Sequence, residues 1–510
     1  MCGILGQFSN SGINKNKLIK NLEITSNRGP DNLGYWISKE NNLFLGSNRL
    51  SIQDLSENAN MPFITKDEKY VVIYNGELYN FKELRAILFN KGYGFETSGD
   101  TEVLLNAYLH FGPDCVKQFE GMFSFCIYDR EKRTLFLARD IVGQKPLYYS
   151  SSNKSFNFSS HLNQLIDNGK INLRGLSNYL MFGYTLNEET LVSGIKKLLP
   201  GHYLKYNINT GDTLIKQFWS INQKRDLLND ESEIIFKMDQ LLNNSVISDR
   251  KPGVLLSGGI DSSLIAYYAS LNSSEKIDTY NVSFDGFKNH NESDYAKKIA
   301  KFLDTNHHEI NGNDISYNMI SPIIKFMGEP IADSSIIPTA LIYSNIKNKS
   351  TVLLGGDGGD ELFGGYPSYI NNSFPLKIDW FNRNIFANLP MGLKGRNYLL
   401  RKNSDNYMLA NDYKYFSKYD INKVVKEFDN KLITSERIVN TNDFVYVMSK
   451  KDLLNYFSED ILVKVDRASM FSSIEARSPF LDKSIVEFAL LNIPSNYKVN
   501  NKKFKYLLKT

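Results

Sequence analysis

Two glycine-rich segments carry side chains suited to phosphate chemistry. Each follows a short apolar run: SGGIDSS spans 257–263, and GGDGGDELFGGY spans 355–366. In the first segment, Gly258 and Gly259 let backbone N–H groups approach an anion, and the serine hydroxyls add donors. Asp261 suits such a site if a divalent cation bridges it to the phosphates. A tight turn with a serine cap is the alternative, but the whole segment between a strand and a helix favours phosphate binding.

The second segment adds acids to its glycines. Asp357, Asp360 and Glu361 follow the apolar run TVLLG (351–355). A loop of this kind can coordinate Mg²⁺ through carboxylates while its backbone reaches a nucleotide. A solvated acidic turn is the alternative interpretation. The first segment lacks the GK[ST] ending of a Walker loop, so the pair indicates a different kind of nucleotide site.

The N-terminus, MCGILGQ (1–7), places a thiol directly after the initiator methionine. An unperturbed thiol has a pKa of about 8.5 and an α-amino group one of about 7.7–8.0. If Met1 is removed, the amine of Cys2 can therefore act as a base for its own thiol near neutral pH. Gly3 permits a close-packed backbone beside that centre. Cys2 is either such a nucleophile or a residue with no chemical role.

Bulk composition excludes several classes of protein. The 510 residues suggest two or three domains, and 42% apolar with 23% charged residues is ordinary for a globular protein. A net charge of +4 from 60 basic and 56 acidic residues argues against a nucleic-acid surface. Neither a long apolar run nor a signal peptide is present, so we expect no membrane association. Three unpatterned cysteines fit a cytoplasmic protein, with Cys115 and Cys126 as core residues.

The elements that must position these residues change in character along the chain. Up to about residue 205, short β-rich runs surround a few helical patches, which predicts an α+β domain. A domain edge is expected within 200–214, and a linker or helix start within 221–233. The predicted strands and helix of this part are LFLGSNRLSI (43–52), YVVIYNGELYNF (70–81), MFSFCIYD (122–129), TLFLARD (134–140) and the helix FKELRAILFNKG (81–92).

After the linker, strands alternate with helices, which predicts an α/β doubly wound parallel sheet. From about residue 370 the sequence is mostly helical in pattern. The elements of the alternating part are the strand, turn and helix of 251–270, the strand 277–284, the helix 292–304, the strand 307–311 and the strand with its glycine loop at 350–366.

SGGIDSS resembles the pyrophosphate-binding loop of ATP pyrophosphatases, which cleave ATP between its α and β phosphates. GGDGGDELFGGY resembles a second signature found in one branch of them, the glutamine-hydrolysing asparagine synthetases. The resemblance extends, in the family's order, over nearly the whole chain. Its other matches are RGPDN (28–32), NGELYN (75–80), SGDTE (98–102), RDIVGQKPLYY (139–149), GEPIADSSIIPT (328–339), ILVKVDRASM (461–470) and EARSPFLD (475–482).

The resemblance implies a fold and a set of site residues. An N-terminal-nucleophile αββα sandwich at 2–210 would be a class II glutaminase, and an ATP pyrophosphatase domain with a helical C-terminal part would span 230–510. Cys2, Asn75, Gly76 and Asp357 would be catalytic. Glutamine would be bound by Arg49, Leu50, Ser51, Ile52, Asn75, Gly76, Glu77 and Asp100. ATP would be bound by Leu256, Ser257, Gly258, Gly259, Asp261, Ser262, Ser263, Val282, Gly355 and Gly356, and Mg²⁺ by Asp261 and Asp360.

Within the glutaminase site the family pattern gives each residue a role. The Asn75 side chain and the Gly76 N–H would form an oxyanion hole, although an Asn-Gly pair alone predicts a hairpin corner. Arg49 would bind the α-carboxylate of glutamine as a fork, and Glu77 and Asp100 its α-ammonium.

The implied reaction uses glutamine, aspartate and ATP with Mg²⁺. Cys2 would release ammonia through a thioester, and ammonia would aminate β-aspartyl-AMP to give asparagine, AMP and pyrophosphate. One alternative keeps both half-sites but amidates another carboxylate, such as a sugar acid or a peptide. A second is a truncated chain that only hydrolyses glutamine or binds nucleotide. A homodimer is expected from the resemblance alone.

The end of the chain, NKKFKYLLKT (501–510), differs from the family pattern. Members usually continue and carry a lysine before a Gly-Phe pair, which is thought to stabilise charge at the adenylate and amide steps. The chain is either a truncated product, or encoded in two parts, or impaired as a synthetase. Lys464 and Lys505 are the candidates to take the place of that lysine.

Overall fold

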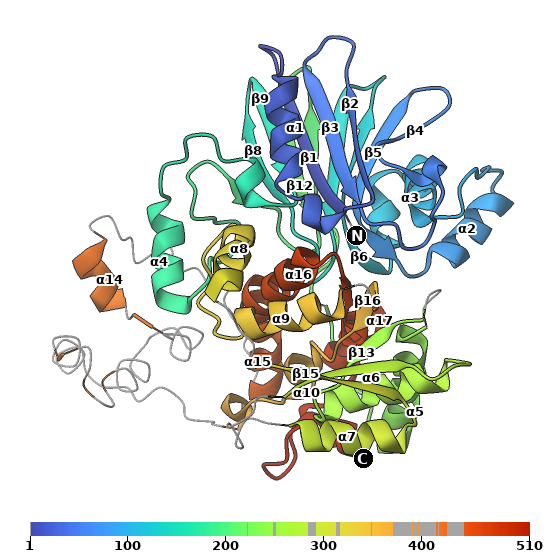
Figure 1. The fold of residues 1–510 in the computed structure, drawn as a ribbon, viewed down its shortest axis with the longest axis vertical. Coiled ribbons are helices and arrows are strands. Elements are labelled where there is room, and N and C mark those ends of the chain that lie inside the picture. Colours follow the sequence, from blue (N-terminus) through green and yellow to red (C-terminus); the bar gives the residue numbers. More distant parts are fainter. Residues whose placement is uncertain are drawn as a thin grey trace.

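The structure is a computed structural model with two parts (Figure 1). The first part contains strands β1 to β12 and the second contains strands β13 to β17. The N-terminus lies where the two parts meet, and the C-terminus lies at the far end of the second part. The residues described are 2–221, 223–247, 251–283, 292–312, 317–347, 349–370 and 443–510, with a few positions between 389 and 425.

The first part contains two six-stranded antiparallel sheets. One has the order β10-β8-β9-β1-β3-β2, and the other has the order β12-β11-β7-β6-β5-β4. The strands of the first sheet are β1 (Cys2–Ser9), β2 (Asn32–Ile37), β3 (Leu43–Arg49), β8 (Tyr148–Ser152), β9 (Ser155–Ser159) and β10 (Lys196–Lys197). Those of the second are β4 (Phe63–Ile64), β5 (Tyr70–Leu78), β6 (Gly121–Asp129), β7 (Thr134–Arg139), β11 (His202–Asn207) and β12 (Thr213–Gln217).

These sheets pack face to face, and helices cover their outer faces. One buried cluster joins Ile4 and Leu45 of the first sheet to Ile73 and Leu137 of the second. Helix α1 (Lys15–Glu23) packs on the first sheet, and α2 (Phe81–Asn90) and α3 (Asp100–Phe111) pack on the second. The predicted αββα sandwich is therefore confirmed. Helix α4 (Leu173–Phe182) lies outside it, beside the second part (Figure 1).

The second part is built on a five-stranded parallel sheet with the order β15-β14-β13-β16-β17. Apolar side chains bury both of its faces, as in doubly wound sheets. Its strands are β13 (Gly253–Leu255), β14 (Asp278–Ser283), β15 (Asn306–Asn311), β16 (Val352–Leu354) and β17 (Glu475–Arg477). Its covering helices are α5 (Glu231–Ser245), α6 (Ile260–Leu271), α7 (Ser293–Phe302), α8 (Tyr317–Met327), α9 (Ile336–Ile346) and α16 (Leu462–Phe471).

The C-terminal part is helical as predicted, within the residues that the structure describes. The predicted helical pattern also covers 371–388, 397–414 and 426–442, which lie outside the described residues. The remaining helices are α10 (Gly359–Phe363), α14 (Lys418–Val424), α15 (Phe444–Asp452), two π-helical segments (Leu453–Ile461 and Phe488–Asn492), α17 (Lys483–Glu487), α18 (Ser495–Lys498) and α19 (Tyr506–Lys509).

The sequence analysis was wrong about one local structure and missed one strand. Asn75 and Gly76 do not lie in a turn, because both belong to the middle of β5 and pair with Ser124 and Phe123 of β6. Asn-Gly pairs tend to form hairpin corners. Here the pairing of all nine residues of β5 with β6 overrides that tendency. Strand β17 was not predicted, because two of its three residues, Glu475 and Arg477, are charged and form no apolar run.

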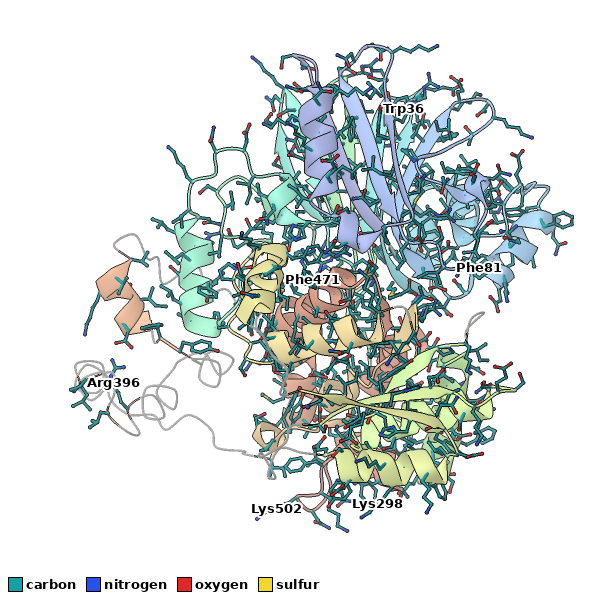
Figure 2. The ribbon with its side chains drawn as sticks, in the orientation of Figure 1. Trp36, Phe81, Lys298, Arg396, Phe471 and Lys502 are labelled. Atoms are coloured by element: carbon teal, nitrogen blue, oxygen red, sulfur yellow. The ribbon has the colours of Figure 1, made fainter. Side chains whose placement is uncertain are left out.

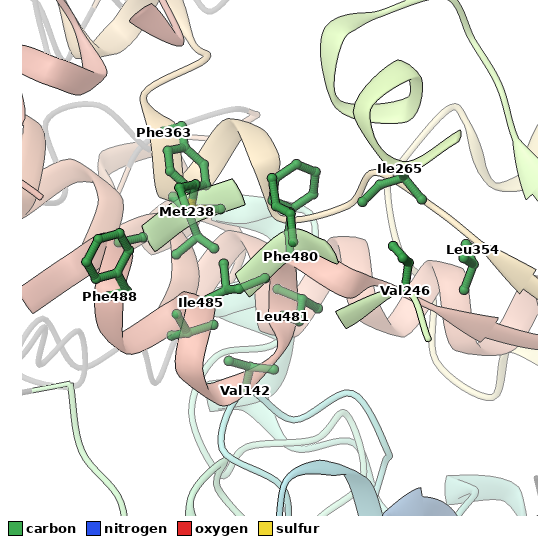
Figure 3. Close-up of a cluster of buried hydrophobic side chains, with 14 of the residues drawn as sticks. Val142, Met238, Val246, Ile265, Leu354, Phe363, Phe480, Leu481, Ile485 and Phe488 are labelled. Carbon is green, nitrogen blue, oxygen red and sulfur yellow. The ribbon is translucent and has the colours of Figure 1, made fainter. Parts of the chain in front are cut away.

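The two parts share buried apolar surface. Leu50 and Met122 of the first part form one cluster with Val352 and Met470 of the second. Phe471, which packs on that cluster, lies at the boundary between the parts in Figure 2. Figure 3 shows a second shared cluster, in which Val142, from the loop after β7, reaches the core of the second part. No helix in the described ranges has the length and apolar character that crossing a membrane would require.

Two candidate active sites

Cys2 is the first residue of β1 and contacts neighbouring elements of the first part directly. It is 5% exposed and pairs across the ladder with Arg49 of β3. Its backbone N–H donates to the Asn75 Oδ1 atom at 3.1 Å, and its carbonyl accepts from the Arg28 Nε atom at 3.1 Å. Arg28 in turn forms a two-pronged ion pair with Asp466 of helix α16, at 2.7 and 2.9 Å. The backbone of the candidate nucleophile is therefore fixed from the second part of the chain.

A cavity of about 50 Å³ opens beside Cys2. Most of the predicted glutamine-binding residues line it, whereas Ser51 does not and donates its N–H to Asp31 at 2.7 Å. Asn75 is outside the lining but contacts the backbone of Cys2. The predicted residues that line the cavity are Cys2, Arg49, Leu50, Ile52, Gly76, Glu77 and Asp100.

Gly76 has a packing reason for lacking a side chain. A Cβ atom there would overlap the Met122 carbonyl and lie 2.6 Å from the Phe123 Cα. The Asn75 Nδ2 atom next to it makes only long contacts, 3.4 Å to Ser160 and 3.5 Å to Ser124. This amide N–H is thus weakly engaged and can donate to a developing oxyanion.

The predicted ion partners of glutamine have protein partners in this structure. Arg49 donates to the Asn60 Oδ1 atom at 2.8 Å and to the Ser56 carbonyl at 3.1 Å. Asp100 accepts from the Tyr74 hydroxyl and from the Leu78 N–H, both at 2.9 Å. Burial raises the pKa of Asp100 to about 6, and these hydrogen bonds offset part of that rise.

Two residues of β17 complete this pocket from the second part, and sequence reasoning missed their contribution. Glu475 lines the cavity, and Arg477 is ion-paired with Glu77 and with Glu475, the latter at 2.7 Å. Burial raises the pKa of Glu77; it would also raise that of Glu475, but Arg477 lowers it below its ordinary value. The motif EARSPFLD contained both residues, but nothing in its spacing joined them to a site some 400 residues earlier.

The predicted phosphate loop follows β13 and starts helix α6. The Ser257 and Ser262 hydroxyls lie 3.0 Å apart, and the Gly259 N–H donates to the Ser257 Oγ atom at 3.2 Å. Ser263 donates to the Gly259 carbonyl at 2.7 Å. Gly258 has a φ of +86°, and a Cβ there would lie 2.6 Å from Tyr295 at the start of α7. The loop is thus a tight, glycine-dependent turn at the carboxyl end of a parallel strand, where ligands of such sheets bind.

The acidic loop after β16 packs directly on the phosphate loop. A Cβ atom on Gly359 would lie 2.5 Å from the Asp261 carboxyl carbon, and one on Gly356 would lie 3.0 Å from the Ser262 nitrogen. The other predicted nucleotide-binding residues occupy the same edge of the sheet. Leu256 follows β13, Val282 is near the end of β14, and Gly355 follows β16.

Asp261 and Asp360, the predicted metal ligands, are joined by a lysine. The Lys505 Nζ atom is ion-paired with the Asp261 Oδ2 atom and lies 2.6 Å from the Asp360 Oδ1 atom. The other oxygen of Asp261, Oδ1, is buried and has no hydrogen-bond partner among the residues that the structure describes. Two carboxylates side by side with an unsatisfied oxygen fit a hard cation such as Mg²⁺.

No group of three or more potential protein ligands for a metal occurs among the residues that the structure describes. A two-carboxylate site agrees with the usual behaviour of Mg²⁺, which is bound by one or two carboxylates together with substrate phosphates. The residues present therefore fit a metal that enters with a nucleotide.

Asp357 lies in the turn before helix α10, three residues before Asp360. Burial raises its pKa, and Lys464 offsets part of this rise. The Lys464 Nζ atom lies 2.9 Å from the Ser335 Oγ atom and 3.1 Å from the Asp333 Oδ2 atom. Of the two candidate lysines, Lys464 therefore lies near Asp357 and Lys505 lies between Asp261 and Asp360.

The fold and the two sites define a protein with an N-terminal-nucleophile amidotransferase half and an ATP pyrophosphatase half. The family model described as a glutamine amidotransferase domain matches residues 1–219, and the one described as asparagine synthase matches residues 237–510. Asparagine synthetase [glutamine-hydrolyzing] 1 of Bacillus subtilis (strain 168) is 32% identical over 543 residues, covering 100% of this chain and 84% of that protein. The chain belongs to the glutamine-hydrolysing asparagine synthetase family and is an enzyme of the carbon–nitrogen ligase class.

Two further relatives show the range of similar proteins. A putative asparagine synthetase [glutamine-hydrolyzing] 2 of Methanocaldococcus jannaschii is 30% identical over 525 residues, covering 92% of this chain and 98% of that protein. A protein of Gibberella zeae named amidase chry2 is 26% identical over 419 residues, covering 72% of this chain and 60% of that protein.

Proposed function

We propose that this protein is a glutamine-hydrolysing asparagine synthetase that joins ammonia from glutamine to the β-carboxylate of aspartate at the expense of ATP. The observation that carries the proposal is that one chain holds both half-sites in contact. Strand β17 lines the cavity beside Cys2 through Glu475, and its Arg477 carbonyl accepts from the Gly355 N–H in the nucleotide loop at 2.9 Å. The glutaminase unit is assigned to residues 2–210 and the synthetase unit to 230–510.

The glutaminase half begins with removal of Met1, which frees the amine of Cys2. That amine takes the thiol proton, and the thiolate attacks the glutamine amide carbon to give a tetrahedral oxyanion. The Asn75 Nδ2–H and Gly76 N–H groups stabilise the oxyanion; one such donor contributes about 3 kcal/mol. The protonated amine of Cys2 then gives its proton to the amide nitrogen, so that collapse of the oxyanion expels ammonia and leaves a thioester. Water hydrolyses the thioester to glutamate and restores the Cys2 thiol.

The synthetase half activates the acceptor. A carboxylate does not accept ammonia at neutral pH, but its adenylate has a good leaving group. The loop 257–263 holds the phosphates of ATP, and Asp261 with Asp360 would hold Mg²⁺, which offsets the charge that builds up on pyrophosphate. Ammonia, crossing between the two parts past the shared apolar cluster around Leu50 and Val352, attacks the β-aspartyl-AMP carbon and displaces AMP.

The deciding experiment uses purified protein, aspartate, ATP, Mg²⁺ and glutamine labelled with ¹⁵N in the amide. We expect labelled asparagine and AMP in equal amounts. Failure of both products to appear together would refute the proposal. A second candidate keeps both half-sites but joins ammonia to a different carboxylate, such as a sugar acid or a peptide. Pyrophosphate release with another acid and none with aspartate would establish that candidate.

The buried carboxyl of Asp100 predicts how glutamine affinity depends on pH. Because its pKa is raised to about 6, Asp100 loses the charge that pairs with the α-ammonium of glutamine as the pH falls below 6. In the inactive Cys2→Ala protein, the glutamine Kd should rise by up to about tenfold per pH unit below that point. Calorimetry between pH 5 and 8 measures this, and Asp100→Asn should bind weakly with no such dependence. If the glutamine Kd of the Cys2→Ala protein with Asp100 intact stays constant over this range, Asp100 does not bind the α-ammonium of glutamine.

A further inference from the structure

Lys505 occupies the position between the two carboxylates that should bind the metal. Its ammonium contacts Asp261 and lies 2.6 Å from Asp360, and its side chain is only 14% exposed. Contact with two carboxylates favours the charged form of this amine. One positive charge thus offsets part of the two negative charges.

The backbone around Lys505 is shaped to deliver this side chain. Lys505 itself has a φ of +50°, and Asn501 and Lys502 before it have φ values of +46° and +63°. Left-handed conformations of non-glycine residues cost free energy and persist where the surrounding structure requires them. Gly365 leaves the necessary room, since a Cβ there would lie 2.5 Å from the Lys505 Cε atom. The backbone and Gly365 thus allow the Lys505 side chain to reach the two carboxylates.

Charge and distance prevent Lys505 and Mg²⁺ from sharing the site unchanged. Mg²⁺ binds oxygen at about 2.0–2.1 Å and repels a cation placed on the same two carboxylates. The metal enters with nucleotide phosphates, which bring several negative charges to the same place. An ammonium released from the carboxylates would find phosphate oxygens beside it, with its flexible four-carbon stem free to turn.

We infer that Lys505 is a placeholder cation, which pairs with Asp261 and Asp360 until a metal–nucleotide binds and then moves onto the pyrophosphate oxygens. This inference rests on the proposed function for the identity of the ligand, but not for the competition with a metal ion. A purely structural ion pair, anchoring helix α19 to helix α6, is the competing explanation.

The experiment measures two affinities, which loss of the Lys505 charge should change in opposite directions. Mn²⁺ alone, followed by loss of its free EPR signal, probes the carboxylates, and Mg²⁺-pyrophosphate, followed by calorimetry, probes the phosphate contact. Lys505→Met should bind Mn²⁺ about tenfold more tightly than the parent protein, because the competing cation is gone, and pyrophosphate about tenfold more weakly. Lys505→Arg should keep Mn²⁺ binding weak.

Matched variants separate the possible outcomes. Lys503→Met removes an exposed lysine of the same turn and should change neither affinity. Asp261→Asn, introduced into the Lys505→Met protein, should abolish the tighter Mn²⁺ site and so assign it. Lys505→Gln is measured in parallel, with circular dichroism, in case the methionine variant folds poorly.

Unchanged Mn²⁺ affinity in both neutral variants would overturn the placeholder role, and unchanged pyrophosphate affinity would overturn the phosphate contact. Loss of both affinities would support the structural anchor instead. Because Mn²⁺ binding needs no nucleotide and no turnover, its result stands even if the parent protein makes no asparagine. A failed labelling experiment would therefore reject the proposed function without deciding the role of Lys505.

Discussion

Replacement of Cys2 by alanine is expected to abolish glutamine-dependent synthesis while leaving ammonia-dependent synthesis intact. Cys2 lines the same cavity as Gly76, and its backbone N–H donates to the Asn75 side chain. Loss of the proposed nucleophile lowers turnover by at least about 10³-fold. The synthetase half keeps its own residues, so ammonium chloride should restore asparagine formation. Glutamate release and asparagine formation, measured with each nitrogen source, check both halves.

Cys126→Ala is the matched control for this variant. Cys126 is fully buried between the two sheets of the sandwich and does not line the cavity beside Cys2. Its loss should reduce stability by about 1 kcal/mol and leave glutaminase activity unchanged. Intact-mass measurement must show that Met1 is absent in both proteins, because a retained methionine would block the amine. Undiminished glutaminase activity in Cys2→Ala with Met1 removed would contradict the nucleophile assignment.

The layered fold was largely predictable because local patterns decide it. Alternating apolar residues predicted β5, β6 and β7, and the strand–glycine–helix pattern predicted β13 with α6. Each of these elements is specified by residues close together in sequence. Strand β17 was not, because its sequence, EAR, is mostly charged, and its strand conformation depends on pairing with β16.

The candidate sites were predictable one segment at a time. Cys2, Gly76 and Asp100 line one cavity as expected, and the Asp261 and Asp360 loops touch as expected. What sequence could not supply was which distant charges meet there. The contacts of Arg477 and Lys505 depend on the packing of separate elements, and a charged residue taken alone is more often a surface residue than part of a buried pair.

The contact behind Cys2 shows how strongly the two parts depend on each other. Asp466 of α16 is buried among three cations: Arg28 at 2.7 Å, Arg467 at 3.7 Å and Lys145 at 3.9 Å. Burial alone would raise the pKa of Asp466, but Arg28 and the other two cations lower it to about 2. Since this pKa lies below the unfolded value, the stabilisation is present at neutral pH and is lost only as the pH falls toward 2.

Asp466→Asn is therefore expected to destabilise the enzyme strongly. It keeps the shape of the side chain but leaves three buried cations without their anion, and uncompensated buried charge of this kind costs about 3–5 kcal/mol. The melting temperature should fall by roughly 10 °C. Arg28→Met should cost less, because Arg467 and Lys145 still balance the remaining carboxylate. It should nevertheless lower glutaminase activity, since the hydrogen bond from Arg28 to the Cys2 carbonyl is lost.

The order of the two effects separates a charge network from simple packing. The charge network predicts a larger loss of stability for Asp466→Asn than for Arg28→Met. If Asp466 only fills space, the isosteric asparagine should instead be tolerated better than the loss of the Arg28 guanidinium. Asp167→Asn is the control, because its ion pair with Lys17 at 2.6 Å is exposed and should contribute less than about 1 kcal/mol. Scanning calorimetry of all three variants, with glutaminase assays at 25 °C, measures both predictions. A network that loses stability at Asp466 and activity at Arg28 would mean that the synthetase half holds the glutaminase nucleophile in place.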